Sequence, residues 1–219
     1  IRNPLTSIRS TIQYVLSGYK EGDSKAELLR ELLREVDRID STLDGLLTLT
    51  RTREFDPEPV DAGETLERSL LLISRQARRK NINIEFHRPG NRLMVRGVAN
   101  ELKQVFMNLL LNALAAVPEC GSIKCDCSVW EQYYDGGIER WAQISIEDSG
   151  AGILPEHMDK IFDPFFTTKN DGTGLGLAVC HGIVQRHEGE IDLQSVPDKG
   201  TVAAVRLPLL YIKEAPGKL

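Results

Sequence analysis

The chain has 219 residues, of which 41% are hydrophobic and 27% charged, and its formal net charge is −5 at pH 7. This composition is typical of a soluble globular protein, and the acidic balance argues against nucleic-acid binding. No apolar run approaches the roughly 20 residues that cross a bilayer, and no signal-peptide pattern stands at the start. The chain opens inside a helical pattern without Met. We therefore expect a cytoplasmic piece of a longer protein, with any membrane anchor in other parts of the parent.

Residues 1–53 carry two helical patterns separated by a polar turn at 17–24. In the second pattern, six apolar side chains and a final threonine recur at alternating steps of three and four residues, at Leu28, Leu32, Val36, Ile39, Leu43, Leu46 and Thr50. One hairpin cannot bury a heptad-type seam of this length. We therefore predict an antiparallel helical hairpin that forms a four-helix bundle in a homodimer.

A second domain is expected at 61–212, after a proline-containing linker at 54–60 and before a polar tail at 213–219. Asp61 resembles an N-cap, because Glu64 follows at the capping-box spacing. Helices are predicted at 61–80, 98–117 and about 174–187, and strands at 82–86, 92–95, 121–130, 141–147, 190–195 and 201–207. Because helices and strands do not alternate as in a doubly wound fold, the pattern favours an α+β sandwich with a mixed sheet and helices on one face.

The four cysteines fit a buried, reduced state better than a metal site. Cys125 and Cys127 alternate with polar residues as in a half-buried strand, and Cys180 lies in an apolar helical pattern. Small buried hydrophobes of this kind, with Cys120 as the fourth, are favoured over zinc ligands and fit a reducing compartment.

The segment Glu147–Leu177 is the main candidate for a binding site. It places Asp148 after an apolar strand, then two glycine clusters separated by an aromatic stretch with a lysine: Gly150 and Gly152, Phe165, Phe166 and Lys169, and Gly172, Gly174 and Gly176. Backbone amides that converge before a helix bind anions. We predict a nucleotide pocket in which Asp148 takes the base, the second cluster takes the phosphates, and the segment between them is a mobile lid anchored or hinged at the two phenylalanines.

Asn108 and Asn112 are four residues apart and share one face of the predicted helix 98–117. Amide oxygens are suitable ligands for Mg²⁺ beside phosphate oxygens and water. The alternative is that both amides bond to backbone groups or solvent. The downstream glycine site favours the metal.

These motifs occur in the order of a known family. The N box is similar to Gln104–Ala116, the G1 box to Asp148–Gly152, the F box to Phe162–Phe166, the G2 box to Gly172–Leu177, and a last glycine motif to Gly200-Thr201. Over residues 1–208 the chain resembles the catalytic core of a bacterial two-component sensor histidine kinase, in the superfamily that includes gyrase, the heat-shock chaperone of 90 kDa and mismatch-repair ATPases. The F-F-T-T-K lid resembles the nitrogen-regulation and acetoacetate-sensing branch.

The resemblance implies ATP and Mg²⁺ as ligands. Asp148 would accept a hydrogen bond from the adenine amino group, Gly150 and Gly152 would let the chain turn beneath the ring, and Thr201 would support the adenine end. Mg²⁺ would be held by Asn112 and Asn108. The triphosphate would be bound by Lys169 together with Gly172, Thr173, Gly174, Leu175, Gly176 and Leu177.

The start I-R-N-P-L-T resembles the helix that follows the family's H-E-x-x-N-P motif. The phosphoacceptor His and its Glu would then lie immediately upstream of Ile1, and none of the four histidines present has that context. The resemblance implies transfer of the phosphoryl group to an aspartate of a response regulator. It also gives Asn3 a possible role in dephosphorylating that regulator.

Two alternatives remain. The first is an ATP-hydrolysing conformational machine of the same superfamily, which carries a glutamate to activate water at the position that Asn108 occupies. The second is a scaffold that binds nucleotide without transfer, which the intact pocket motifs disfavour.

Overall fold

The computed structural model describes residues 2–20, 23–50, 55–88, 90–134, 137–169 and 172–210. The chain forms two compact units. One contains residues 1–51 together with 163–175, and the other contains residues 52–162 and 176–219. The lid segment therefore groups with the N-terminal helices, although the second unit flanks it on both sides in the sequence.

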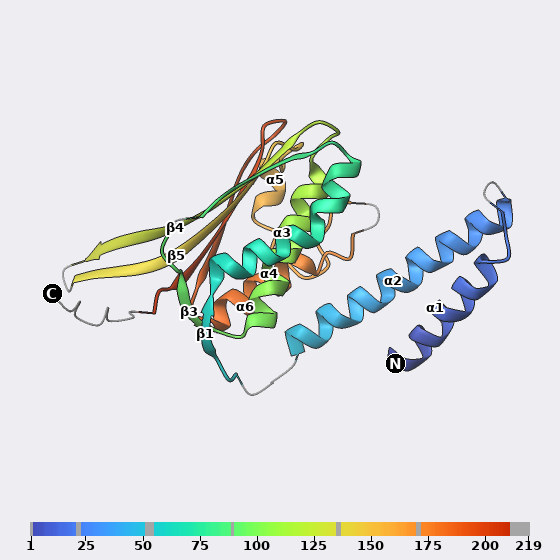
Figure 1. Ribbon diagram of the computed structural model, residues 1–219, viewed down its shortest axis with the longest axis horizontal. Helices are drawn as coiled ribbons and strands as arrows, with labels where there is room; N and C mark the ends of the chain where they lie inside the picture. The colour runs from blue at the N-terminus through green and yellow to red at the C-terminus, as the bar shows by residue number, and fades with distance from the viewer. Residues whose placement is uncertain are drawn as a thin grey trace. The chain divides into compact units, whose positions relative to one another are not determined.

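The first unit is mainly a pair of helices, α1 (Arg2–Leu16) and α2 (Ser24–Thr50), which form the predicted hairpin (Figure 1). An ion pair joins them, with 3.4 Å between Arg9 Nε and Asp37 Oδ1. The predicted helical hairpin is thus confirmed.

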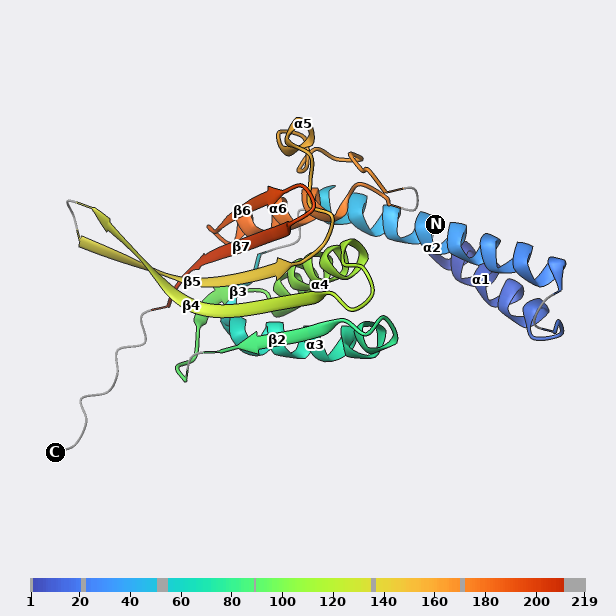
Figure 2. The same ribbon diagram turned by 90° about the horizontal axis from the view of Figure 1, so that it is seen from above.

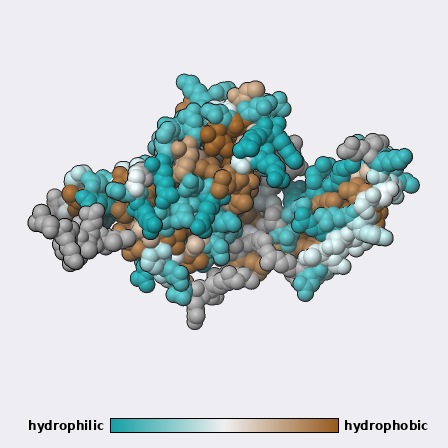
Figure 3. All heavy atoms as spheres, viewed as in Figure 1, coloured by the Kyte–Doolittle hydropathy of each residue, from teal (hydrophilic) through white to brown (hydrophobic). Residues whose placement is uncertain are grey.

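Much of the predicted seam on α2 is uncovered within one chain. Leu28, Leu32 and Ile39 are 61%, 53% and 43% exposed. Figure 3 shows apolar side chains along the visible face of the hairpin. Several large apolar side chains exposed along one helix are typical of an interaction surface.

The second unit is built on a five-stranded sheet with the order β2-β4-β5-β7-β6. Its strands are β2 (Asn83–His87), β4 (Ser122–Tyr134), β5 (Gly137–Asp148), β6 (Glu190–Val196) and β7 (Gly200–Pro208). The pair β2–β4 is parallel and the other pairs are antiparallel. The prediction of a mixed sheet is therefore confirmed.

Helices cover one face of this sheet, as Figure 2 shows. They are α3 (Ala62–Arg79), α4 (Ala99–Ala116) and α6 (Gly176–Arg186), and a short helix, α5 (Pro155–Met158), follows β5. Asp61 caps α3 as predicted, because its Oδ1 accepts a hydrogen bond of 3.1 Å from the Glu64 N–H. None of the helices that the structure describes combines the length and apolar character needed to cross a bilayer.

The core lies between the sheet and these helices. Along β5, Ala142, Ile144 and Ile146 are buried while the residues between them are more exposed. They meet α4, which buries Phe106 and Leu110 completely. This period of two ends on Asp148, so the same alternation that builds the core turns that carboxylate inward.

Three of the four cysteines are buried, as predicted, and Cys120 is exposed, which corrects the prediction for that residue. Burial raises the pKa of Cys125 to about 12, that of Cys127 to about 11 and that of Cys180 to about 12. Cys120 differs because it lies in the turn between α4 and β4, outside the alternating part of the strand. No group of residues within the described ranges has the composition of a histidine, cysteine or carboxylate metal site.

A small second sheet was missed by the sequence analysis. Strand β1 (Glu58–Asp61) begins in the predicted linker, ends at the predicted N-cap Asp61, and pairs antiparallel with β3 (Met94–Gly97). Pro59 made a strand unexpected here, because proline has no N–H to donate to a neighbouring strand. In a short two-stranded sheet such as this one, that N–H is not needed.

The β4–β5 hairpin is also longer than predicted. Its register continues past Trp130↔Trp141 to Tyr134↔Gly137, although β7 ends opposite Trp141. In this two-stranded extension Arg140 Nε lies 2.9 Å from Glu131 Oε1 across the strands. Both faces of the extension meet solvent, so it lacks the apolar alternation by which strands are recognised.

A buried histidine joins α6 to the start of α4. His187 is 4% exposed, its Nε2 accepts from the Val98 N–H at 3.0 Å, and its Nδ1 lies 2.8 Å from the Ile183 carbonyl oxygen. These partners require a neutral ring with its proton on Nδ1. Phe55 packs edge-on against the ring with centroids 5.0 Å apart, and Glu101 Oε2 is 4.0 Å from Nδ1.

We predict that His187 makes the second unit less stable in mild acid. Burial lowers the pKa of His187 below its usual value of 6.5. As the pH falls, His187 is therefore protonated in the unfolded chain before it is protonated in the folded one. The contribution of His187 to the free energy of unfolding is fully present above pH 6.5 and decreases as the pH drops below that value. His187→Leu should cost about 1–3 kcal/mol at pH 7.5 by leaving the Val98 N–H unpaired, and should flatten the pH dependence between 5.5 and 7.5. Urea unfolding measures the loss of stability and its pH dependence, with His181→Gln, a change at a half-buried histidine, as the control. If the free energy of unfolding of His187→Leu depends on pH as steeply as that of the unmodified chain, His187 does not have this role.

Candidate nucleotide site

The site in the second unit is organised around Asp148 at the end of β5. Its neighbours across the sheet are Ile123 on β4 and Thr201 on β7. The Asp148 side chain is 7% exposed, and its Oδ1 accepts a hydrogen bond of 2.8 Å from the Gly150 N–H. One carboxylate oxygen is therefore held by the backbone of the turn that follows the strand, which fixes the direction of the group.

Gly150 and Gly152, the first glycine cluster, are required by the packing of the protein itself. A Cβ on Gly150 would lie 2.7 Å from the Ala116 carbonyl carbon, and one on Gly152 would overlap the Val196 carbonyl oxygen. Gly152 also has a φ of +70°. These glycines were predicted to allow close approach of a ligand and a turn of the chain beneath the ring. In the structure they let the turn after β5 pack against α4 and β6.

Thr201 takes part in a hydroxyl network that the sequence analysis did not identify. Ser195 Oγ donates to the Gly200 carbonyl oxygen at 2.9 Å and lies 2.8 Å from Thr201 Oγ1. It also accepts from the Ile153 N–H at 2.8 Å. Because the Ser195 proton is used on Gly200, the Thr201 hydroxyl is the donor between the two. The remaining lone pairs of Thr201 can act as acceptors beside Asp148.

Asn108 and Asn112 are both half-buried on α4, on the predicted face. Asn108 Nδ2 donates to the Gly176 carbonyl oxygen at 3.2 Å, which joins the middle of α4 to the first residue of α6. The amide nitrogen of Asn108 is thus used within the protein, and its oxygen is the atom suited to a cation. The alternative stated from the sequence was that both amides bond to backbone groups or solvent. For Asn108 this holds for the amide nitrogen, which bonds to the Gly176 backbone.

The predicted phosphate residues are divided between the two units. Gly176 and Leu177 begin α6, whereas Lys169 and residues 172–175 belong to the first unit. Lys169 is exposed, its N–H donates to Thr167 Oγ1 at 3.1 Å, and its carbonyl oxygen accepts from the Gly172 N–H at 3.1 Å. Asn170 and Asp171, within the predicted lid, lie outside the described residues.

Phe165 closes the lid segment onto the second glycine cluster. Its N–H donates to the Gly174 carbonyl oxygen at 2.9 Å, and both residues have left-handed backbones, with φ of +70° and +67°. A Cβ on Gly174 would overlap the Phe165 backbone. Phe165 thus ties the segment to Gly174, whereas the predicted movement of the lid stays a prediction.

The four histidines are in structural or surface positions, as expected. His87 lies 3.4 Å from Asp126 Oδ1, His157 is in α5, and His181 stacks near Phe162 with centroids 5.2 Å apart. Asn3 is exposed in the first turn of α1. None of these positions suggests a metal site or a phosphoacceptor.

Comparison with known proteins agrees with the motifs. The model for the histidine kinase-, DNA gyrase B-, and HSP90-like ATPase family matches residues 97–211, and that for the His Kinase A (phospho-acceptor) domain matches residues 1–55. The chain is 34% identical over 216 residues to the sensor histidine kinase ZraS of Escherichia coli (strain K12), covering 99% of this chain and 45% of ZraS. It is also 34% identical over 209 residues to the signal transduction histidine-protein kinase AtoS of the same strain, covering 95% of this chain and 33% of AtoS.

A solved structure of histidine kinase ThkA in complex with the response regulator protein TrrA is similar as well. It has a TM-score of 0.70 and 26% identity, with 97% of this chain and 60% of that chain covered. The chain spans less than half the length of the curated relatives that it matches.

We predict that Gly152→Ala destabilises the second unit by roughly 1–3 kcal/mol or more. A left-handed backbone strains a non-glycine residue, and the added methyl group would overlap the Val196 backbone. Thermal unfolding measures the loss. Gly90→Ala is the matched control, because a Cβ there meets nothing within 4 Å. Equal stability of the two variants would show that the turn after β5 adjusts freely.

Proposed function

We propose that this chain, which belongs to the histidine kinase-, DNA gyrase B-, and HSP90-like ATPase family, is the catalytic core of an ATP-dependent protein-histidine kinase of a two-component system. The buried Asp148 carboxylate, oriented by the Gly150 N–H, carries the proposal. The γ-phosphoryl group would pass from ATP to a histidine just upstream of Ile1, and then to an aspartate of a response regulator in the cytoplasm.

Asp148 has the properties needed to select adenine. A carboxylate oriented by a backbone N–H and shielded from water is a strong acceptor for the adenine amino group. Guanine presents a carbonyl oxygen at that position, which the negative charge of the carboxylate would repel. The acceptor lone pairs of Thr201, next to Asp148 in the sheet, fit the same polar edge.

The metal and phosphate ends of the site are proposed from α4 and the second glycine cluster. Mg²⁺ would be held by the amide oxygens of Asn112 and Asn108, a donor type that this ion accepts beside phosphate oxygens. Lys169 and the amides of residues 172–177 would neutralise the triphosphate. Phosphoryl transfer depends mostly on positioning and charge stabilisation, and Mg²⁺ supplies much of that charge.

The hydrolytic alternative is less well supported. Water activation needs a base near the metal, and Asn108 cannot serve as one because an amide does not accept a proton at neutral pH. Asn108 is also bonded to Gly176. A response-regulator phosphatase activity is proposed for Asn3, whose exposed position on α1 leaves its amide accessible.

The uncovered seam on α2 supports dimerisation through residues 1–53. Two hairpins that pack their seams together would form the four-helix bundle expected of a phosphoacceptor domain. The same bundle would present the histidine to the kinase domain and to the response regulator.

The function is tested with Asp148→Asn. The change keeps the size of the side chain and removes its charge, so ATP affinity in calorimetry should fall roughly tenfold or more. In a chain extended by His-Glu before Ile1, acid-labile phosphate from labelled ATP should fall in parallel, and chelation of Mg²⁺ should abolish it in every variant. The control is Asp192→Asn on β6, whose carboxylate bonds to Gln194. Unchanged ATP affinity in Asp148→Asn would refute the adenine assignment, and no phosphohistidine in the extended chain would refute the kinase.

We predict that Leu28→Glu combined with Leu32→Glu converts a dimer into a monomer. Two charges on the exposed seam would have to lose their hydration inside the bundle, at a cost of several kcal/mol. Sedimentation equilibrium of the whole chain measures the change. The control is Arg34→Glu, which places the same residue at an exposed position of α2 outside the seam. A double variant that sediments as the unmodified chain does would argue against the seam as the interface.

A further inference from the structure

Phe55, in the linker predicted at 54–60, packs against two successive residues at the end of α6. Its ring meets the His187 ring edge-on, with the two centroids 5.0 Å apart. The Arg186 guanidinium lies 5.9 Å from the Phe55 centroid, within the range of a cation–π contact. One aromatic side chain of the linker is therefore anchored on the second unit.

The same two residues make the polar contacts between the end of α6 and the start of α4. His187 Nε2 accepts from the Val98 N–H at 3.0 Å, and Arg186 Nη2 lies 2.6 Å from Glu101 Oε2. We call these two contacts the α4–α6 joint. Polar contacts are stronger where water is excluded. Because Phe55 lies on both His187 and Arg186, it covers the joint from the linker side.

The backbone that follows Phe55 leads to the same ring. Strand β1 begins three residues later, and its first residue, Glu58, pairs with Gly97 of β3. A Cβ on Gly97 would lie 2.8 Å from His187 Cδ2, so a side chain at this position would collide with the buried ring. The linker is thus connected to His187 both by the Phe55 side chain and through the pairing of β1 with β3.

The joint bears on nucleotide binding because α4 and α6 carry the proposed ligand groups. Asn108 and Asn112 are on α4, and Gly176 and Leu177 begin α6. Asn108 Nδ2 donates to the Gly176 carbonyl oxygen at 3.2 Å, so sliding one helix along the other would disturb this contact too. Binding groups must be held within about 0.5 Å of their productive positions. A loosened joint would therefore weaken the site.

We propose that Phe55 is a positioning residue for the nucleotide site, which it supports by covering the α4–α6 joint. This inference rests on the proposed function. A change in the linker that lifts Phe55 from His187 would admit water to the joint, loosen α4 on α6 and weaken ATP binding. By linkage, bound ATP would hold Phe55 in place. The linker between the two units would thus regulate the affinity of the site.

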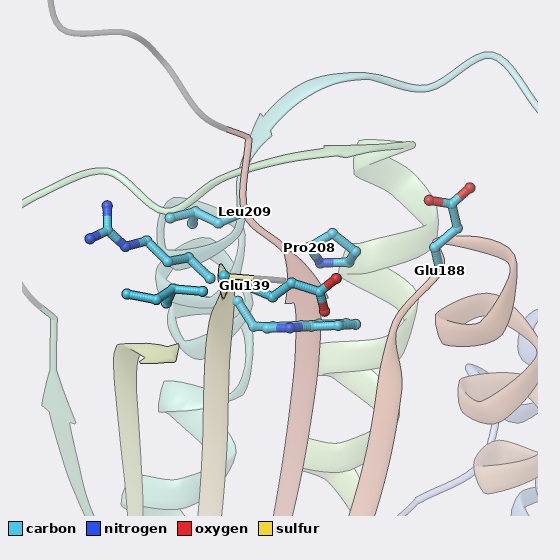
Figure 4. Close-up of a pocket in the computed structure, with 8 residues that line it drawn as sticks. Glu139, Glu188, Pro208 and Leu209 are labelled. Carbon is cyan, nitrogen blue, oxygen red and sulfur yellow. The ribbon is translucent and has the colours of Figure 1, made fainter. Parts of the chain in front are cut away.

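The covered ring also gives this role a pH signature. The charged groups that act on His187 are Glu101 of α4 and Arg186 of α6, and burial is the largest cause that lowers the pKa of His187. Glu188, the next residue, lines an open cavity of about 820 Å³ (Figure 4). Removing Phe55 would expose the ring, so the pKa of His187 should rise towards its usual value of 6.5.

The test is ATP calorimetry with Phe55→Ala in the full chain. The Kd should rise roughly fivefold at pH 7.5, and Phe55→Leu, which keeps an apolar cover, should restore most of the affinity. The ratio of the Kd values of Phe55→Ala and the unmodified chain, in which the titration of ATP itself cancels, should grow as the pH falls from 7.5 to about 6, because the exposed ring is protonated first. In His187→Leu, adding Phe55→Ala should raise the Kd by less than about twofold.

Tyr133→Ala is the matched control, because it removes an aromatic side chain that is 71% exposed on the β4–β5 extension. It should bind ATP as the unmodified chain does. Urea unfolding shows whether each variant is folded, and Phe55→Val takes the place of Phe55→Ala if that variant is not.

The inference is overturned if Phe55→Ala leaves the Kd unchanged, if its Kd ratio does not depend on pH, or if it weakens binding equally in the His187→Leu background. These results would leave the proposed function intact. A folded, unmodified chain that binds no ATP would instead refute the proposed function, and the inference with it.

Discussion

The close approach of two backbones where β5 meets β7 is the constraint on which the site depends. The position of a Cβ on Gly200 is filled by the carbonyl oxygen of Asp148, so only glycine permits this pairing. The register Asp148↔Thr201 follows from it. A slip of one residue would move Asp148 to the open face of the sheet, because side chains alternate between faces. The register between β5 and β7 therefore determines both the inward direction of the Asp148 side chain and the packing of the core.

The position of α4 is fixed by polar contacts with α6 near its start and at its middle. Near its start, the Val98 N–H bonds to His187; at its middle, Asn108 bonds to Gly176. The apolar contacts between these helices are not directional, whereas the two hydrogen bonds specify how far α4 can slide or rotate. The face that carries Asn108 and Asn112 is thereby held in one orientation relative to the start of α6.

The sequence was most informative where residue type and periodicity agree. The helical hairpin and the mixed sheet follow from spacing that the core imposes. Strand β1 was missed because Pro59 is unfavourable in most strands, and the β4–β5 extension because both its faces meet solvent. The roles of Ser195 and His187 depend on contacts between residues far apart in the chain, which no local pattern reveals. The glycines were recognised as important, but their main packing partner is the protein itself.

The unequal environments of the cysteines have a practical consequence. The thiols at Cys125, Cys127 and Cys180 are buried and have a raised pKa, so they are poor nucleophiles at neutral pH. Cys120 is exposed, and it directly precedes Gly121, whose missing side chain allows close packing beside Ser149. A fluorophore or spin label attached through a maleimide would therefore react at one natural position, next to the residue that packs beside the turn following Asp148. The native chain thus carries its own attachment point for spectroscopy at the edge of the candidate nucleotide site.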